Sequence, residues 1–441
     1  MAHPGRRRCF ASMNALARFV AEYLEAVRGF SRPARLFLLS TSLTFAAYGV
    51  NSVLFNLYLT AGGFRESFVG RVVSLNALGV VILALPAGLI ADRWGRRRTI
   101  LLGILIEGLG FAARATALSP PLIAGSSFLV GGAQALCAIA AAPYISEHST
   151  ARERTHLFSA YFSVELLCGV VGSALGGWVP SLLVHLTAGA PIGLLAAYRI
   201  TLFLGAAIAF AAWAPLALSG GAPEAMLTHD RAAFGHAARR IVPVAANAFL
   251  IGSGAGLVIP FMNLYFATRF RCSSAQIGMF FAIAYVMTAV ATAMGPGLAR
   301  RFGKLRTATA MELLSLPFLV TLGAERRLEV AVVAFWLRAT LMQSGTPLIN
   351  TLVMESLPAG LRARASSLIN TVWNGGWAVS ATLSGFIIQR FGYAVPFYIT
   401  AVLYATAAIG LYVSLRHEPE VQIEPAAPAE RPVHPETPIV E

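Results

Sequence analysis

The amino-acid sequence predicts an all-α integral membrane protein whose twelve transmembrane helices form two six-helix bundles related by pseudo-two-fold symmetry. Three observations predict this class: the composition, the apolar runs and an internal repeat. Of the 441 residues, 57% are hydrophobic and only 12% are charged. The mean hydropathy is +0.68. Soluble domains carry about 25% charged residues, so the composition indicates a chain that spans lipid.

The apolar runs give the number of spans. A helix needs about 20 mostly apolar residues to cross a bilayer, and twelve such runs follow one another along the chain. The short alternating segments typical of transmembrane strands are not found in the sequence. The predicted spans are 36–59, 67–91, 99–118, 121–145, 157–182, 196–218, 241–266, 275–299, 307–323, 328–354, 365–389 and 394–415.

The net charge of +14 is explained by topology. Most of the 34 basic residues fall in the N-terminal segment, the C-terminal tail and every second loop, which is the positive-inside pattern. It predicts that both termini are cytoplasmic and argues against nucleic acid as a partner. Only one basic residue is a lysine. This bias, with abundant alanine, indicates a bacterium of high genomic GC content and hence the inner (plasma) membrane.

The second half of the chain repeats the first. The segment DRWGRRRT at 92–99 matches RRFGKLRT at 300–307, a separation of 208 residues, and NLY at 56–58 matches NLY at 263–265. Charged loop residues at a constant separation indicate a duplicated six-span unit. The expected organisation is a cytoplasmic segment at 1–35 with an interfacial helix over 14–30, bundles at 36–218 and 241–415, a cytoplasmic linker at 219–240 and a disordered tail at 416–441.

The segment GLIADRWGRRRTI at 88–100 resembles the signature between spans 2 and 3 of the major facilitator superfamily. The resemblance covers nearly the whole chain. It implies two bundles that rock about a central site, with Asp92 near the start of span 11 and paired with cytoplasmic arginines in a latch. We expect Gly88 to allow a close helix approach and Gly95 to make a tight turn. The gating residues predicted in this way are Gly88, Asp92, Arg93, Gly95, Arg96, Arg97, Glu147, Arg154, Arg301, Gly303, Glu355 and Arg362.

Polar stripes at helical spacing mark the candidate walls of a substrate cavity. They lie on spans 1, 10 and 11, which the resemblance places around the central site. Asn and Thr in membrane helices also serve as interhelical contacts, so the stripes are candidates only. The predicted substrate-binding residues are Tyr48, Asn51, Ser52, Asn56, Gln134, Glu165, Arg338, Gln343, Asn350, Asn370, Trp373, Asn374 and Trp377.

Two of these candidates are charges embedded in spans. Glu165 in span 5 and Arg338 in span 10 lie near the predicted midplane, where a charge is costly and by default functional. They are interpreted either as substrate contacts or as a mutually neutralising pair. The family's Arg in span 4 and Pro in span 5 are missing here, since Ser173 stands where that Pro belongs. This weakens proton-coupled export, although Glu165 would still carry a proton if burial raised its pKa.

The predicted function is secondary active transport of a small organic solute by alternating access, leaning towards efflux of amphipathic or drug-like compounds. Uptake or export of a sugar or an anionic metabolite is the alternative, and a non-transporting receptor on the same fold is a third reading. No catalytic, nucleotide-binding or metal motif occurs, so we expect neither an enzyme nor a cofactor. The expected partners are the solute, a coupling proton or Na⁺ and the lipid bilayer. The protein is expected to be a monomer.

Overall fold

The computed structural model describes residues 29–186, 193–220, 238–356 and 359–416. The proposed interfacial helix at 14–30, most of the linker and the tail lie largely or wholly outside these residues. The described chain is helical, and the predicted fold class is confirmed. Ten of its segments are long and apolar enough to cross a membrane, and two more helices, α13 and α14, have 29 and 33 residues.

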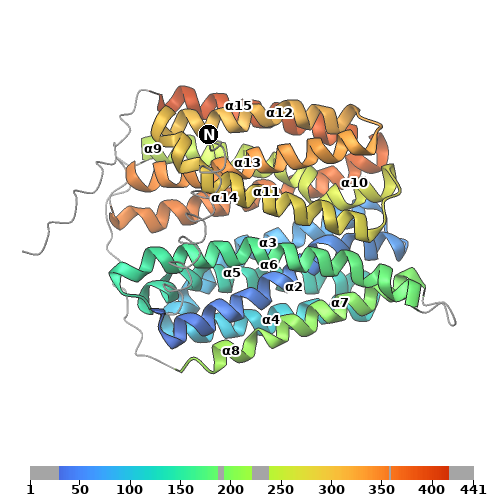
Figure 1. The fold of residues 1–441 in the computed structure, drawn as a ribbon, viewed down its shortest axis with the longest axis horizontal. Coiled ribbons are helices and arrows are strands. Elements are labelled where there is room, and N and C mark those ends of the chain that lie inside the picture. The colour runs from blue at the N-terminus through green and yellow to red at the C-terminus, as the bar shows by residue number, and fades with distance from the viewer. Residues whose placement is uncertain (1–28, 187–192, 221–237, 357–358, 417–441) are drawn as a thin grey trace, which may run out of the picture.

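The helices form two groups that lie side by side along a common direction (Figure 1). The N half comprises α2 (Arg32–Ala61), α3 (Glu66–Trp94), α4 (Arg96–Thr116), α5 (Pro120–Glu147), α6 (Ala151–Leu186), α7 (Leu194–Ala211) and α8 (Trp213–Ala217). The C half comprises α9 (Ala238–Val258), η1 (Ile259–Phe261), α10 (Met262–Arg269), α11 (Ser274–Phe302), α12 (Lys304–Ala324), α13 (Leu328–Ser356), α14 (Ala359–Phe391) and α15 (Ala394–Leu415).

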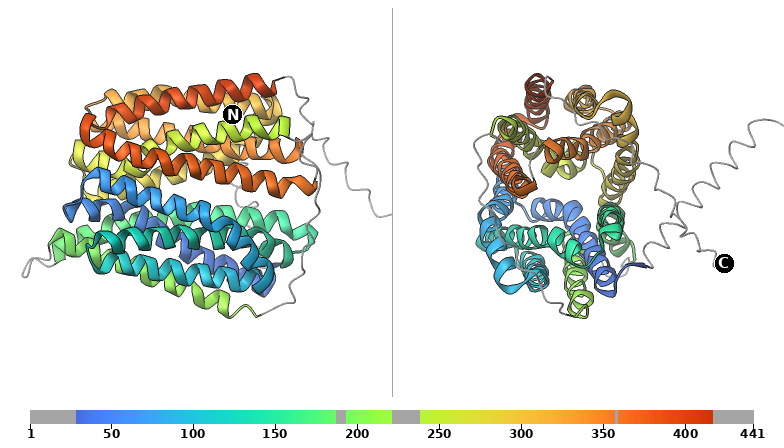
Figure 2. Two further views of the ribbon diagram at one scale, coloured as in Figure 1. Left: turned by 180° about the vertical axis from the view of Figure 1, so that it is seen from behind. Right: turned by 90° about the vertical axis from the view of Figure 1, so that its left-hand side faces the viewer.

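The two ends of the molecule are named here by the chain itself. The linker end is where α8 ends and α9 begins, at the left of Figure 1, and the far end is where α2 turns into α3. The view from the linker end shows the two halves facing each other across the middle (Figure 2, right). The main contacts between them are α3 with α14 and α6 with α11.

Two spans are interrupted where the sequence predicts continuous helices. The sixth span breaks at Ala212 between α7 and α8, and the seventh becomes a single 3₁₀ turn at Ile259–Phe261 before α10. Pro260 explains the second break, because proline has no N–H to donate and its ring clashes with the preceding turn. The break exposes the Pro260 carbonyl to a partner in the other half.

The tight turn predicted at Gly95 is confirmed, and Gly303 makes the same turn in the second copy of the charged loop. Gly95 separates α3 from α4 with φ 89°, and Gly303 separates α11 from α12 with φ 87°. Such a left-handed backbone favours glycine. Each glycine therefore lets two antiparallel spans follow each other with no intervening loop, which places the flanking arginines directly at the linker end.

Candidate functional site

The far ends of the two halves are held together by a reciprocal pair of hydrogen bonds. The Asn56 side chain donates to the Pro260 carbonyl, and the Asn263 side chain donates to the Val53 carbonyl at 2.9 Å. The two donors are 207 residues apart, and the two acceptors are also 207 residues apart, so the pair of hydrogen bonds follows the internal repeat. We call these two hydrogen bonds the asparagine clasp. They join α2 to the η1–α10 segment, the equivalent element of the other half.

The tyrosine of the repeated Asn-Leu-Tyr triplet makes a hydrogen bond within its own half. The Tyr58 hydroxyl donates to the Ala115 carbonyl at 3.4 Å, and the Tyr265 hydroxyl donates to the Leu322 carbonyl at 2.7 Å. These acceptors are again 207 residues apart. The sequence singled out the triplet but did not predict its role. Its constant separation was the signal that could have revealed Asn263 as a counterpart of Asn56.

Close backbone contacts between the halves also follow the repeat. A Cβ on Gly70 would lie 2.5 Å from the Ala381 carbonyl, and a Cβ on Gly278 would lie 2.5 Å from the Ser173 carbonyl. Gly177 and Gly385 occupy the facing positions on α6 and α14. The described hydrogen bonds between the halves, including Ser274 to the Gly177 carbonyl at 3.0 Å, lie toward the far end. The structure is therefore closed at that end.

At the linker end the charged cluster is organised by Arg96. This residue is 2% exposed, and its guanidinium lies 3.5 Å from the Asp92 carboxylate and 3.2 Å from the Glu147 carboxylate. These contacts join α3, α4 and α5. The neighbouring Arg97 donates to the Leu216 carbonyl at 3.1 Å and to the Ser219 hydroxyl at 3.2 Å. Both arginines thus tie elements of the N half to one another.

The other predicted gating residues are less engaged. Arg93 is exposed, Arg154 donates to the Ser146 carbonyl at 3.2 Å and Arg301 packs over the Phe302 ring. No described atom of a neighbouring helix lies within 4 Å of a Cβ built on Gly88. The expectation of a close helix approach at Gly88 is therefore wrong for this conformation.

The predicted latch is seen only in part. Asp92 pairs with Arg96, and its side chain is 43% exposed. The ion pairs of Arg96 with Asp92 and with Glu147 lie within the N half. The side chains of residues 353–364, which include Glu355, Arg362 and the start of α14, are not described. The pairing of Asp92 with that helix stays a prediction.

Between the two ends, Glu165 of α6 lies near three tyrosines. Tyr161 is one turn before it on α6, the Tyr285 ring of α11 would lie 3.3 Å from a Cβ built on Gly169, one turn after it, and Tyr48 of α2 is near enough for the carboxyl charge to act on its hydroxyl. Tyr48 is 45% exposed and is one turn from Ser52, whose carbonyl accepts a hydrogen bond from Asn263 of the C half at 3.3 Å. This face of α2 therefore looks towards the C half. We call the four side chains the Glu165 cluster. The sequence predicted Glu165 and Tyr48 but missed Tyr161 and Tyr285.

Arg338 does not join that cluster in this conformation. It is 4% exposed and donates to the Tyr404 hydroxyl at 3.0 Å, with its guanidinium 5.7 Å from the Tyr404 ring centre. It is thus held between α13 and α15 inside the C half. Asn51 is likewise buried in its own half, where it donates to the Ala47 carbonyl at 3.1 Å beside Gly205 of α7.

The polar stripe of α14 is continuous. The Asn374 amide donates to the Asn370 side-chain oxygen at 2.9 Å, and the Trp373 and Trp377 rings lie 4.9 Å apart. On α13, Gln343 and Asn350 are exposed, and on α5 Gln134 is partly exposed. Amides next to indole rings suit an amphipathic ligand. The side chains that share an exposed helix face remain candidates for substrate contact.

Comparison with known proteins agrees with this architecture. The chain is 30% identical over 164 residues to the niacin transporter NiaP of Acinetobacter baylyi, which covers 37% of this chain and 36% of that protein. It is 29% identical over 125 residues to the 4-hydroxybenzoate transporter PcaK of Pseudomonas aeruginosa, covering 28% and 27%. The chain thus aligns with about a third of the length of these relatives.

Solved structures show the same fold over most of the chain. A bacterial homologue of the human lysosomal transporter Spinster, in an inward-facing and occupied conformation, superposes with a TM-score of 0.72 at 16% identity, covering 87% of this chain and 96% of that one. The nucleoside transporter NupG gives 0.68 at 14% identity, covering 88% and 100%. The model of the Major Facilitator Superfamily matches residues 37–231 and 244–440. This multi-pass membrane protein therefore belongs to the Major Facilitator Superfamily.

Proposed function

We propose that the protein is a secondary active transporter that moves a small organic solute by alternating access. The observation that carries the proposal is the set of repeat-related contacts between the two halves at the far end. The asparagine clasp and the glycine contacts close that end, and at the linker end a cluster of basic residues stands beside Gly95 in one half and beside Gly303 in the other. Two packed bundles with exchangeable contacts at opposite ends form a bistable element of the kind that such transport requires.

The chemistry of the Glu165 cluster favours a neutral or cationic amphipathic solute. The cluster offers a carboxyl group and three phenol rings, and α14 adds the Trp373 and Trp377 indoles. Cations are attracted both to a carboxylate and to the faces of aromatic rings. Arg338 is held by Tyr404, and the charge of Arg114, which acts on Tyr48, is opposed by that of Glu107 on the same helix, so Glu165 keeps the site net acidic. Export of such compounds is the direction we propose.

A second candidate is an aromatic carboxylate. The relatives named for niacin and 4-hydroxybenzoate transport favour it. An anionic solute beside Glu165 requires that this carboxyl be protonated or balanced by a bound cation, because two carboxylates at close range repel each other. The same residue would then couple the solute to a proton or to Na⁺.

Thermal stability of the purified protein separates the two candidates, since a ligand that binds the folded state raises the melting temperature. We would test tetraphenylphosphonium against nicotinate and 4-hydroxybenzoate at two pH values. Stabilisation by the cation that disappears in Glu165→Gln supports the first candidate. Stabilisation by the acids that persists or strengthens in Glu165→Gln supports the second.

The control for this substitution is Glu329→Gln, the same chemical change in the first turn of α13. It should leave either response intact. If no compound of the three stabilises the wild type, the substrate proposal fails. Uptake of labelled solutes into proteoliposomes then tests transport itself. A protein that binds a solute but moves none would support the hypothesis of a non-transporting receptor.

The membrane orientation follows from the charges at the linker end. Arg93, Arg96, Arg97 and Arg98 stand there beside Gly95, and Arg300, Arg301, Lys304 and Arg306 stand there beside Gly303. By the positive-inside rule, we infer that the linker end is cytoplasmic, with both termini on that side of a bacterial inner membrane. Fluorescent and phosphatase fusions at the two termini would check this topology.

A further inference from the structure

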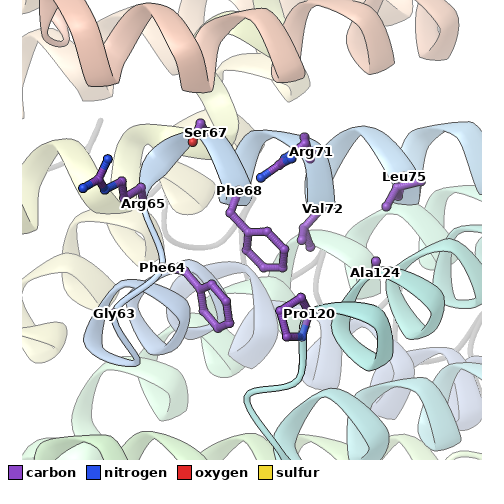
Figure 3. A pocket seen from close by; sticks show the side chains of 10 residues that line it. All are labelled: Gly63, Phe64, Arg65, Ser67, Phe68, Arg71, Val72, Leu75, Pro120 and Ala124. Carbon is purple, nitrogen blue, oxygen red and sulfur yellow. The ribbon is translucent and has the colours of Figure 1, made fainter.

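A groove on the outer surface of the N half, at the far end, has no part in the transport proposal. It has a volume of about 630 Å³ and lies where the α2–α3 loop meets the starts of α3 and α5. Two arginines, Arg65 and Arg71, border it, and Phe64, Phe68 and Pro120 form its floor (Figure 3). The two phenyl rings stack at 4.4 Å. The groove is therefore basic at one edge and apolar beneath.

The position of Arg71 on α3 shows that this groove faces lipid. At 100° per residue, Arg71 lies within about 20° of Leu78, Ile82 and Leu89. These three are 38%, 55% and 61% exposed. The other faces of α3 are occupied, since Ser74 donates to the Ala378 carbonyl of α14 and Asn76 donates to the Ser127 carbonyl of α5. Arg71 thus heads the stripe of α3 that is directed away from the protein.

A cation at that place needs an anionic partner. Arg71 lies five residues after the start of α3, or about 7.5 Å along the helix at 1.5 Å per residue. Charges on a lipid-facing surface are costly unless they reach the interface or are paired. In Figure 3 the Arg71 side chain turns back along α3 towards the Arg65 end. Among the described residues, neither the Arg65 nor the Arg71 guanidinium has a carboxylate within 4.0 Å. Glu66 instead interacts electrostatically with Tyr393, the residue that precedes α15.

We propose that this groove binds the phosphate of an anionic phospholipid between Arg65 and Arg71, with an acyl chain lying over Phe68 and Leu75. Arginine pairs well with phosphate oxygens, to which it can donate two parallel hydrogen bonds. The apolar part continues from Phe68 through Leu75 deeper into the span, while Arg65 stands at its start. Basic groups at the interface above an apolar slope match a lipid better than a water-soluble anion.

Native mass spectrometry with phosphatidylglycerol tests the proposal on the full chain. The wild type should retain bound phosphatidylglycerol several-fold more than phosphatidylcholine. The double variant Arg65→Gln/Arg71→Gln should lose that preference. The matched control is Arg326→Gln/Arg327→Gln, which removes two exposed arginines from the α12–α13 loop at the same end and should keep it. Equal retention in both double variants would overturn the proposal.

Two further arms distinguish the lipid from a free anion. Melting temperature should rise with phosphatidylglycerol and not with millimolar inorganic phosphate, and equal stabilisation by phosphate would reject a lipid as the occupant. Phe68→Ala should reduce the increment given by phosphatidylglycerol, measured against its own lipid-free baseline. If Phe68→Ala keeps the full increment, the acyl chain does not lie on this floor and the proposal fails in that part.

Discussion

Asn56 and Asn263 show how a single polar residue acts inside a membrane helix. Each side chain reaches a backbone carbonyl of the opposite half, and Pro260 leaves its neighbourhood irregular enough to offer one. A hydrogen bond of this kind contributes about 0.5–1.5 kcal/mol, and membrane examples average about 0.6 kcal/mol. The clasp is therefore strong enough to bias a conformational equilibrium but weak enough to open.

We expect Asn56→Ala and Asn263→Ala each to shift the equilibrium towards a far end that is open. A loss of about 1 kcal/mol corresponds to roughly a fivefold change in population. Spin labels on Ala61 and Arg327, exposed on opposite halves at that end, would report the change as a longer distance in double electron–electron resonance.

Asn51→Ala is the control for both variants, because Asn51 donates to Ala47 within its own helix. It should leave the distance distribution unchanged. The repeat also predicts that the two clasp variants have effects of the same direction and similar size. A shift in only one of them would contradict the reciprocal clasp.

At the scale of elements, Arg96 is the residue that joins three helices. It is buried, and it contacts Asp92 at the end of α3 and Glu147 at the end of α5. Asp92 is more exposed, at 43% of its side chain. Arg96 and Asp92 should therefore contribute differently to the stability of the fold, even though the family resemblance gives both a gating role.

Arg96→Gln should lower the melting temperature by several degrees. Breaking a buried ion pair costs about 3–5 kcal/mol, reduced here by the partial exposure of both carboxylates. Asp92→Asn should cost under about 1 kcal/mol, as for an exposed pair, and yet slow transport at least tenfold if the carboxylate closes the linker end. Differential scanning fluorimetry and proteoliposome uptake measure the two effects, with Arg93→Gln as the exposed control. An Asp92→Asn protein with full transport would exclude the latch.

The elements themselves were largely predictable from the sequence. Apolar runs gave the spans, and the glycines at 95 and 303 gave the turns, because each reflects a local requirement of the backbone. The break at Pro260 was missed, since proline is tolerated within membrane helices and Pro86 indeed lies inside unbroken α3. Whether a proline interrupts a span depends on which neighbours can donate a hydrogen bond to the carbonyl that it leaves unpaired.

The candidate site was harder to predict than the spans. Periodicity places a residue on a helix face but does not say which neighbour occupies that face. Arg338 and Glu165 both lie near the middle of their spans, yet one reaches Tyr404 inside the C half and the other meets tyrosines from α2 and α11. The sequence does not tell which end is closed, because a protein that works by the alternating access proposed here must encode both conformations in one chain.

At the scale of the whole molecule, the far-end contacts can be made permanent. The Ser181 and Ser274 hydroxyl oxygens, on α6 and α11, lie 3.4 Å apart, which suits a disulfide between cysteines at these positions. In a background with the four native cysteines replaced, oxidised Ser181→Cys/Ser274→Cys should transport at least tenfold more slowly than the reduced form. Reductant should restore the rate, and each single cysteine variant should be insensitive to it.

The same locked protein should still bind its solute, because alternating access as proposed here requires that the central site open to the linker end when the far end is closed. Stabilisation by the solute in a melting experiment should therefore survive oxidation while transport does not. Loss of both would mean that the disulfide distorts the site. Full transport by the oxidised protein would mean that the halves need not separate at α6 and α11, and the rocking of two bundles about a central site would have to be abandoned for this chain.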